Sequence, residues 1–193
     1  MFTNRKATIA WAIGVLVVIE ACFCMWEFVI RPRADLCDNH YGITVHCKSE
    51  GLLRESEQEL DKLPDRLLAA FEQEEWSLWI GDDYLRGEQA LIDSRISGAT
   101  HPARKEVLVS GAAEILHEFG HFLYLHLGEP EDFTDVYAQE AGNSPLRLYY
   151  QQDAHEYFAE CFAYYISGID IFGDTPVTLR YFDQLRSENW RLA

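Results

Sequence analysis

Apolar residues recur at helical spacing over residues 57–74 and then alternate, as in a strand, over residues 76–80. Between residues 57 and 74, leucine and phenylalanine recur at helical spacing, at Leu60, Leu63, Leu67, Leu68 and Phe71. This spacing predicts an amphipathic helix that begins either at residue 57 or at Pro64. Residues 76–80 (WSLWI) then alternate and are followed by Gly-Asp-Asp, which predicts a strand and a turn.

Three further short strands are predicted before the next apolar run. They cover residues 90–92, 96–100 and 107–110, and the last two are joined closely enough to form a hairpin. With the strand at residues 76–80, they predict a small sheet.

The C-terminal half predicts helices. The run from Gly111 to Leu127 is apolar on nearly every face, which predicts a central buried helix that ends at the following Gly-Glu-Pro. A polar, irregular stretch to Leu148 precedes a second apolar helix from Asp153 to Ile166. Thr175-Pro176 is typical of the start of a closing helix. Helices that follow a small sheet predict an α+β fold.

The N-terminal segment has a different character. Residues 7–30 are apolar apart from Glu20 and Glu27, and this run is long enough to span a bilayer. We therefore expect residues 1–33 to form a signal anchor that binds the membrane through residues 7–30. The alternative is a signal peptide cut after Ala21, which would release a secreted protein. Basic residues on both flanks leave the orientation open.

Cysteines argue for a domain outside the cytosol. Cys37 and Cys47 lie ten residues apart around a turn-rich stretch, within residues 34–57 that we expect to form a linker. A disulfide between them would place the domain, residues 58–193, on the extracytoplasmic side of the membrane. Two thiols that do not pair are the alternative. Cys161 lies in an apolar helical pattern and is expected to be a small core residue.

Charge excludes one class of partner. Residues 34–193 carry 12 Lys and Arg against 30 Asp and Glu, a formal charge of −18. A surface of this sign disfavours nucleic acid. The acidity is explained most simply by solubility, with a preference for basic substrates as the sharper alternative.

The pattern His117-Glu118-Phe119-Gly120-His121 lies in the predicted central helix. Residues four apart share one helix face, so both imidazoles can reach one ion, with Glu118 beside a water on it. Zinc suits this ligand set, and one Zn²⁺ per chain is expected. A metzincin pattern is absent, and His126 points about half a turn away from His117.

A catalytic zinc needs a third protein ligand and an open position. The next apolar helix offers Glu156 and Glu160, four residues apart, so that one can bind the metal while the other accepts a hydrogen bond from a ligand histidine. A solvated helix face is the alternative explanation for this pair. His155 is a rival ligand that lies about 100° around the helix from Glu156.

These two motifs together resemble the catalytic domain of anthrax toxin lethal factor and the related secreted Pro-Pro endopeptidases, which are gluzincins. His-Glu-Phe-Gly-His is followed about 35 residues later by Glu-Tyr-Phe-Ala-Glu, and the likeness covers residues 58–193. The resemblance implies a zincin-like fold with a small mixed sheet, Glu156 as third zinc ligand and Tyr149 as a catalytic residue. Tyr150, beside it, is the alternative candidate for that tyrosine. The anchor and the cysteine pair lie outside this likeness.

The resulting hypothesis is a zinc metalloendopeptidase that hydrolyses an extracytoplasmic protein or peptide. Glu118 would act as general base and Tyr149 would stabilise the oxyanion. The substrate would lie along an edge strand at residues 96–100 or 107–110. The alternative is a catalytically idle, membrane-anchored domain of the same fold that binds or inhibits a partner. A structural zinc site is disfavoured because such sites use four Cys or His ligands.

Overall fold

A five-stranded mixed sheet, in the order β1-β2-β3-β5-β4, forms one part of the fold. The computed structural model describes residues 36–38, 41–92 and 96–192. The strands are β1 (Leu36–Asp38), β2 (Thr44–Cys47), β3 (Ser77–Ile80), β4 (Gly98–His101) and β5 (Glu106–Val109). β2, β3 and β5 are parallel, whereas β1 and β4 are antiparallel to their neighbours. The predicted α+β class with a small mixed sheet is thus confirmed, and β4 lies at a sheet edge.

Residues 34–57 contribute structure where we expected a linker. β1 and β2 form an antiparallel pair in which Cys37 is opposite Val45, so the turn-rich stretch does fold back on itself. β2 then pairs with β3, and α2 (Glu50–Leu60) follows after Ser49, whose hydroxyl accepts a hydrogen bond from the backbone of Leu52. A polar composition concealed these elements, because their stability comes from packing on one face.

The helix expected at residues 57–74 is two helices. α2 ends at Leu60, and α3 (Asp65–Gln73) starts after Pro64, which lacks the N–H that a continuous helix would need. The strand predicted at residues 90–92 was wrong, and the turn predicted at residues 81–83 is reduced to a bend at Gly81, because α4 (Asp82–Ile92) covers residues 82–83 and 90–92. The strands expected at residues 76–80, 96–100 and 107–110 are present within two residues of their predicted ends.

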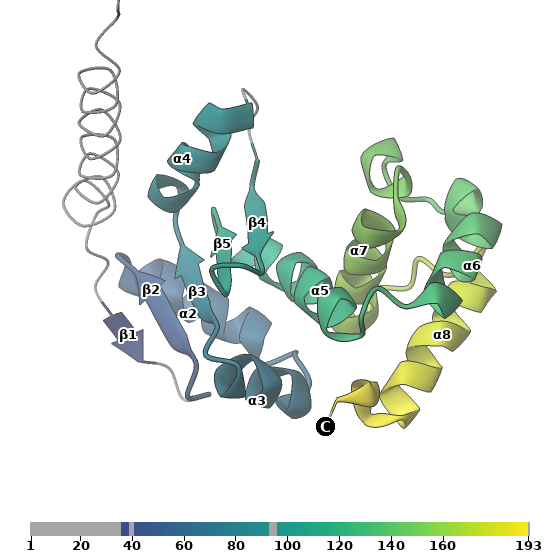
Figure 1. The fold of residues 1–193 in the computed structure, drawn as a ribbon, viewed down its shortest axis with the longest axis horizontal. Coiled ribbons are helices and arrows are strands. Elements are labelled where there is room, and N and C mark those ends of the chain that lie inside the picture. The colour runs from purple at the N-terminus through teal and green to yellow at the C-terminus, as the bar shows by residue number, and fades with distance from the viewer. Residues whose placement is uncertain (1–35, 39–40, 93–95, 193) are drawn as a thin grey trace, which may run out of the picture. The chain divides into compact units, whose positions relative to one another are not determined.

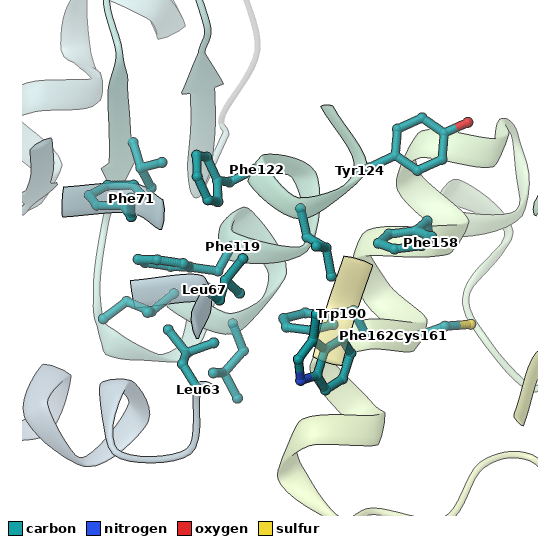
Figure 2. Packing of buried hydrophobic residues seen from close by; sticks show 14 of the residues in the cluster. Leu63, Leu67, Phe71, Phe119, Phe122, Tyr124, Phe158, Cys161, Phe162 and Trp190 are labelled. Carbon is teal, nitrogen blue, oxygen red and sulfur yellow. The ribbon is translucent and has the colours of Figure 1, made fainter. Parts of the chain in front are cut away.

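The central helix packs against the sheet on one side and against the C-terminal helices on the other. α5 (Ile115–His126) follows a 3-10 turn at Ala112–Glu114 and lies between the sheet with α2–α4 and the helices α6–α8 (Figure 1). Phe119 and Phe122 contact Phe71 of α3, with ring centroids 4.8 and 5.2 Å apart (Figure 2). On the other side, the Tyr124 ring lies 5.1 Å from that of Phe158. Each fully buried aromatic side chain contributes about 1.5–3 kcal/mol of transfer free energy.

A second buried helix lies directly against α5. α7 (Ala154–Ser167) begins after Asp153, whose carboxylate accepts a hydrogen bond from the backbone N–H of Glu156, and ends at Gly168 in the left-handed conformation. A Cβ atom added to Gly120 would lie 2.6 Å from the Cα of Ala159. Glycine at this position therefore lets the two helices approach closely.

Two more helices complete the fold. The stretch predicted as irregular up to Leu148 contains α6 (Glu131–Glu140), which sequence analysis missed. The predicted closing helix is present as α8 (Pro176–Ser187), followed by a 3-10 turn at Asn189–Arg191. The Glu140 carboxylate accepts hydrogen bonds from the backbone N–H groups of Val177 and Thr178, so a distant acid caps α8.

The predicted anchor at residues 7–30 lies outside the described residues. Among the residues that the structure describes, no helix is long and apolar enough to cross a membrane. The described side chains form no disulfide, and that of Cys37 is not among them, so the pairing with Cys47 stays a prediction. Cys47 and Cys161 are buried.

Candidate metal centre

α5 presents His117 and His121 on one face. Their Nε2 atoms lie 3.1 Å apart, and both side chains are largely buried. The four-residue spacing brings the rings together across one helical turn. The apolar residues on the remaining faces of α5 fix the helix in the core, so the two imidazoles are held in place.

α7 supplies two carboxylates to the same histidines. Glu156 Oε2 lies 3.5 Å from His117 Nε2, and Glu156 Oε1 lies 3.6 Å from His121 Nε2. Glu160 Oε2 lies 2.9 Å from His117 Nδ1, on the other side of that ring. The structure therefore brings Glu156 to the two facing nitrogens and Glu160 to the far nitrogen of His117.

These distances fit a metal ion. A tetrahedral zinc with ligand bonds of about 2.0–2.1 Å separates its ligand atoms by about 3.3 Å. The three contacts among His117, His121 and Glu156 span 3.1 to 3.6 Å, and the two from Glu156 are made by its two different carboxylate oxygens. Glu156 Oε2 is buried and accepts no hydrogen bond from the described residues. Donor atoms of His117, Glu118 and His121 also lie within 4.8 Å of one another, so this group can hold a metal ion.

The close approach of these side chains shifts their pKa values in the metal-free protein. Burial disfavours the charged form of His117, but its interactions with the carboxylates of Glu156 and Glu160 prevail and raise its pKa to about 10. Burial lowers the pKa of His121 to about 4, and the charge on His117 adds to this effect. Burial opposes ionisation of Glu156, yet the two histidines lower its pKa. In the metal-free protein, the positive charge of His117 thus offsets the neighbouring carboxylates.

The carboxylate of Glu118 is enclosed between α5 and the edge strand. It is 4% exposed, and Thr100 Oγ1 donates a hydrogen bond of 2.7 Å to its Oε2. A Cβ atom added to Gly98 would lie 2.2 Å from Glu118 Oε1, so β4 has space for this carboxylate only because residue 98 is glycine. Burial raises the pKa of Glu118 to about 7, against the opposing effects of His117 and Thr100. A carboxylate with this pKa is suited to exchange protons near neutral pH.

The two candidate tyrosines lie in a 3-10 turn, Leu148–Gln151, before α7. The Tyr149 hydroxyl donates a hydrogen bond of 3.3 Å to Glu156 Oε1, and the side chain is 56% exposed. The Tyr150 ring lies 5.5 Å from the His117 ring. Burial raises the pKa of both phenols, that of Tyr150 to about 12, so both remain protonated donors at neutral pH. Tyr149 is the one whose hydroxyl reaches a candidate ligand.

The remaining histidines of this region have other partners. His126 Nδ1 lies 2.8 Å from Glu74, away from the site as its position on the helix predicted. His155 packs against the ring of Tyr124 and lies 3.8 Å from Glu129. The structure therefore gives Glu156, and not His155, the place beside His117 and His121.

An open cleft of about 800 Å³ leads to the site. β4 and its flanks form one wall, from Ile96 to Pro102, and α5, the turn with Tyr149 and Tyr150, and Glu156 form the rest. The charged groups among the described lining residues are carboxylates and histidines, and no Lys or Arg is among them. A cleft of this size and shape can hold an extended peptide segment.

Sequence analysis missed Gly98, Thr100 and Glu114 as members of this site. Thr100 and Gly98 meet Glu118 only because β4 lies beside α5, and no spacing in the sequence indicates that contact. Glu114 had a signal, since it precedes Glu118 by one helical turn. Comparison of the chain with protein-family models and with curated proteins finds no match.

Proposed function

We propose that this chain is a zinc-dependent endopeptidase of the gluzincin type, with a zincin-like fold. The observation that carries the proposal is the triangle formed by His117, His121 and Glu156, whose spacing suits one zinc ion, with the Glu118 carboxylate beside it. Three protein ligands leave one position open, as catalytic rather than structural zinc sites do. The likeness to lethal factor and the Pro-Pro endopeptidases supports the same assignment.

The residues divide the chemistry between them. Zinc, when bound, supplies a Lewis acid that polarises the scissile carbonyl and lowers the pKa of water. Glu118 accepts the proton of the attacking water and delivers it to the leaving amine, and its raised pKa allows both transfers. The Tyr149 hydroxyl donates a hydrogen bond to the developing oxyanion. Glu160 accepts a hydrogen bond from His117 and so orients that ligand.

Substrate would bind along β4. This strand pairs with β5 on one side only among the described residues, and residues 96–100 line the cleft opposite Glu118. An extended peptide that adds to this edge gains backbone hydrogen bonds whatever its sequence. We place the domain outside the cytosol, tethered through residues 7–30, on the grounds of the apolar segment and the Cys37/Cys47 pair.

The test is peptide-library cleavage by the full chain in detergent, followed by mass spectrometry and metal analysis. We expect about one zinc per chain and cleavage that a chelator abolishes and added zinc restores. Glu118→Gln should keep its zinc and lose cleavage. Glu131→Gln, which changes an exposed carboxylate in the first turn of α6, is the matched control and should cleave normally.

A folded, zinc-loaded protein that cleaves no peptide would favour the idle binding domain instead. Cleavage that persists in Glu118→Gln would remove the assigned general base. Tyr149→Phe and Tyr150→Phe decide between the tyrosines, because loss of the oxyanion donor lowers kcat by about a hundredfold or more. The larger loss should fall on Tyr149.

A further inference from the structure

Glu114 is a carboxylate that the proposed mechanism does not use. It ends the 3-10 turn before α5 and occupies the N-cap position of that helix, yet its side chain accepts no capping hydrogen bond. It forms no ion pair within 4 Å among the described residues. Helix capping and charge pairing, the usual structural roles of such a residue, therefore do not account for it.

Glu114 lines two neighbouring hollows. It lines the cleft together with His117 and Tyr150, and the same three residues also line a neighbouring cavity of about 730 Å³, which we call the side cavity. These three residues therefore lie where the linings of the two hollows meet. Glu114 lies at the junction and is only partly exposed.

The side cavity combines apolar walls with few unpaired charges. Leu116, Pro145, Leu146 and Ala163 supply apolar surface, and Tyr164 adds an aromatic ring. Lys62 and Glu59, which also line it, pair with each other at 2.6 Å, and the Glu160 carboxylate is engaged by His117. This leaves Glu114 on the cleft side and Arg147, an exposed residue, as the charged lining residues without a partner in the described structure.

The charges of the described residues that line the cleft leave Glu114 without a compensating cation. A bound Zn²⁺ would be neutralised by Glu118 and Glu156, whereas Glu114 would keep an uncompensated negative charge at the cleft wall. No Lys or Arg among the described residues lines the cleft to offset it. A group of this kind attracts a cation and repels an acidic side chain.

We propose that Glu114 determines specificity by selecting substrates with a Lys or Arg side chain next to the scissile bond. The aliphatic stem would lie along the cleft wall beside Tyr150, and the ammonium or guanidinium would pair with the Glu114 carboxylate. This inference rests on the proposed peptidase function. It defines the substrate class as peptides with a basic residue beside the cleaved bond.

The test compares matched peptides with the full chain loaded with zinc. A cleaved library peptide is resynthesised with Lys, Arg, norleucine or Glu at each position flanking the scissile bond, and kcat/KM is measured. We expect one position to prefer Lys or Arg over norleucine by about tenfold or more, and Glu to be worst. The preference should shrink as salt rises from about 0.05 to about 0.5 M, since this position is partly exposed.

Variants assign the preference to one carboxylate. Glu114→Gln should bring the Lys-to-norleucine ratio close to one, and Glu114→Lys should reverse the order of Lys and Glu peptides. Glu131→Gln, again at the N-terminal turn of a helix but outside the cleft, should keep the wild-type ratio. Zinc content and thermal unfolding identify any variant that fails to fold. If one does, Glu114→Asp replaces it in the comparison. Its shorter side chain should lower the Lys-to-norleucine ratio.

Two results would overturn the inference. One is a wild-type ratio near one, and the other is an equal ratio in Glu114→Gln. If the wild type cleaves nothing, binding of labelled peptides to zinc-loaded Glu118→Gln decides instead. Tighter binding of the Lys peptide would support the inference while the peptidase proposal fails. Equal binding, or none, would reject the inference as well.

Discussion

The contact between Thr100 and Glu118 predicts that an edge-strand hydroxyl controls catalysis without touching the metal. The Thr100 hydroxyl donates a 2.7 Å hydrogen bond to a carboxylate that is 4% exposed. Hydrogen bonds to charged groups contribute about 1.5–3 kcal/mol, and each 1.4 kcal/mol is about a factor of ten in rate. Thr100→Val, which keeps the shape and removes the donor, should therefore lower kcat about ten- to a hundredfold.

The loss should fall on kcat rather than on KM, because in the proposed mechanism Glu118 transfers a proton in the transition state and does not hold the substrate. Steady-state kinetics on one cleaved peptide, with zinc content measured in parallel, separates the two. Thr100→Ser retains the hydroxyl and should recover most of the rate. A Thr100→Val enzyme with one zinc and a wild-type kcat would refute the reasoning. Gly98→Ala perturbs the same carboxylate by contact and should lower kcat likewise.

Three further predictions concern packing, ligand orientation and pH. Gly120→Ala forces a Cβ to within 2.6 Å of Ala159 Cα and should lower the free energy of unfolding by about 1–3 kcal/mol in thermal melts. Gly87→Ala in α4 meets no atom within 4 Å and should not destabilise. Glu160→Gln should weaken zinc binding about ten- to a hundredfold in chelator competition.

The pH prediction follows from His117, whose pKa is raised from 6.5 to about 10 in the metal-free protein. The stability gained from its charged form is fully present below pH 6.5 and lost as pH rises through about 10. Zinc must displace this proton, so affinity should rise about tenfold per pH unit below that value. The increase in melting temperature on adding zinc should accordingly widen from about pH 6 to about pH 9, and a constant increase would contradict the assignment.

Sequence patterns located the two long apolar helices, and physical reasons explain why. α5 and α7 are apolar on most faces, and their ends carry local signals, such as the left-handed Gly168. Residues at positions i and i+4 lie on one face of any α-helix, so the geometry of a single element is sufficient to predict these pairs. They hold in any fold that keeps the helix, so the facing of His117 with His121 needed no tertiary information.

The helices that sequence analysis missed owe their stability to tertiary contacts. α2 and α6 are short and rich in carboxylates, and each buries a few side chains on one face. In α6, Phe133 and Val136 have helical spacing, and Pro130 precedes the first turn, which would have been sufficient signals. α4 contains Gly87, which lowers helix propensity, and follows a Gly-Asp-Asp sequence that is also typical of a turn.

Three elements build the candidate site, and under the proposed function they separate metal binding from catalysis. His117 and His121 come from α5 and Glu156 from α7, so the ligand triangle depends on the close approach that Gly120 permits. The restraint on Glu118 comes instead from β4. Substitutions at the α5/α7 contact should therefore reduce zinc affinity and activity together, whereas substitutions in β4 should reduce activity at full zinc content. If variants of both kinds lost zinc in parallel, β4 would be part of the metal site's scaffold and not a separate restraint on the general base.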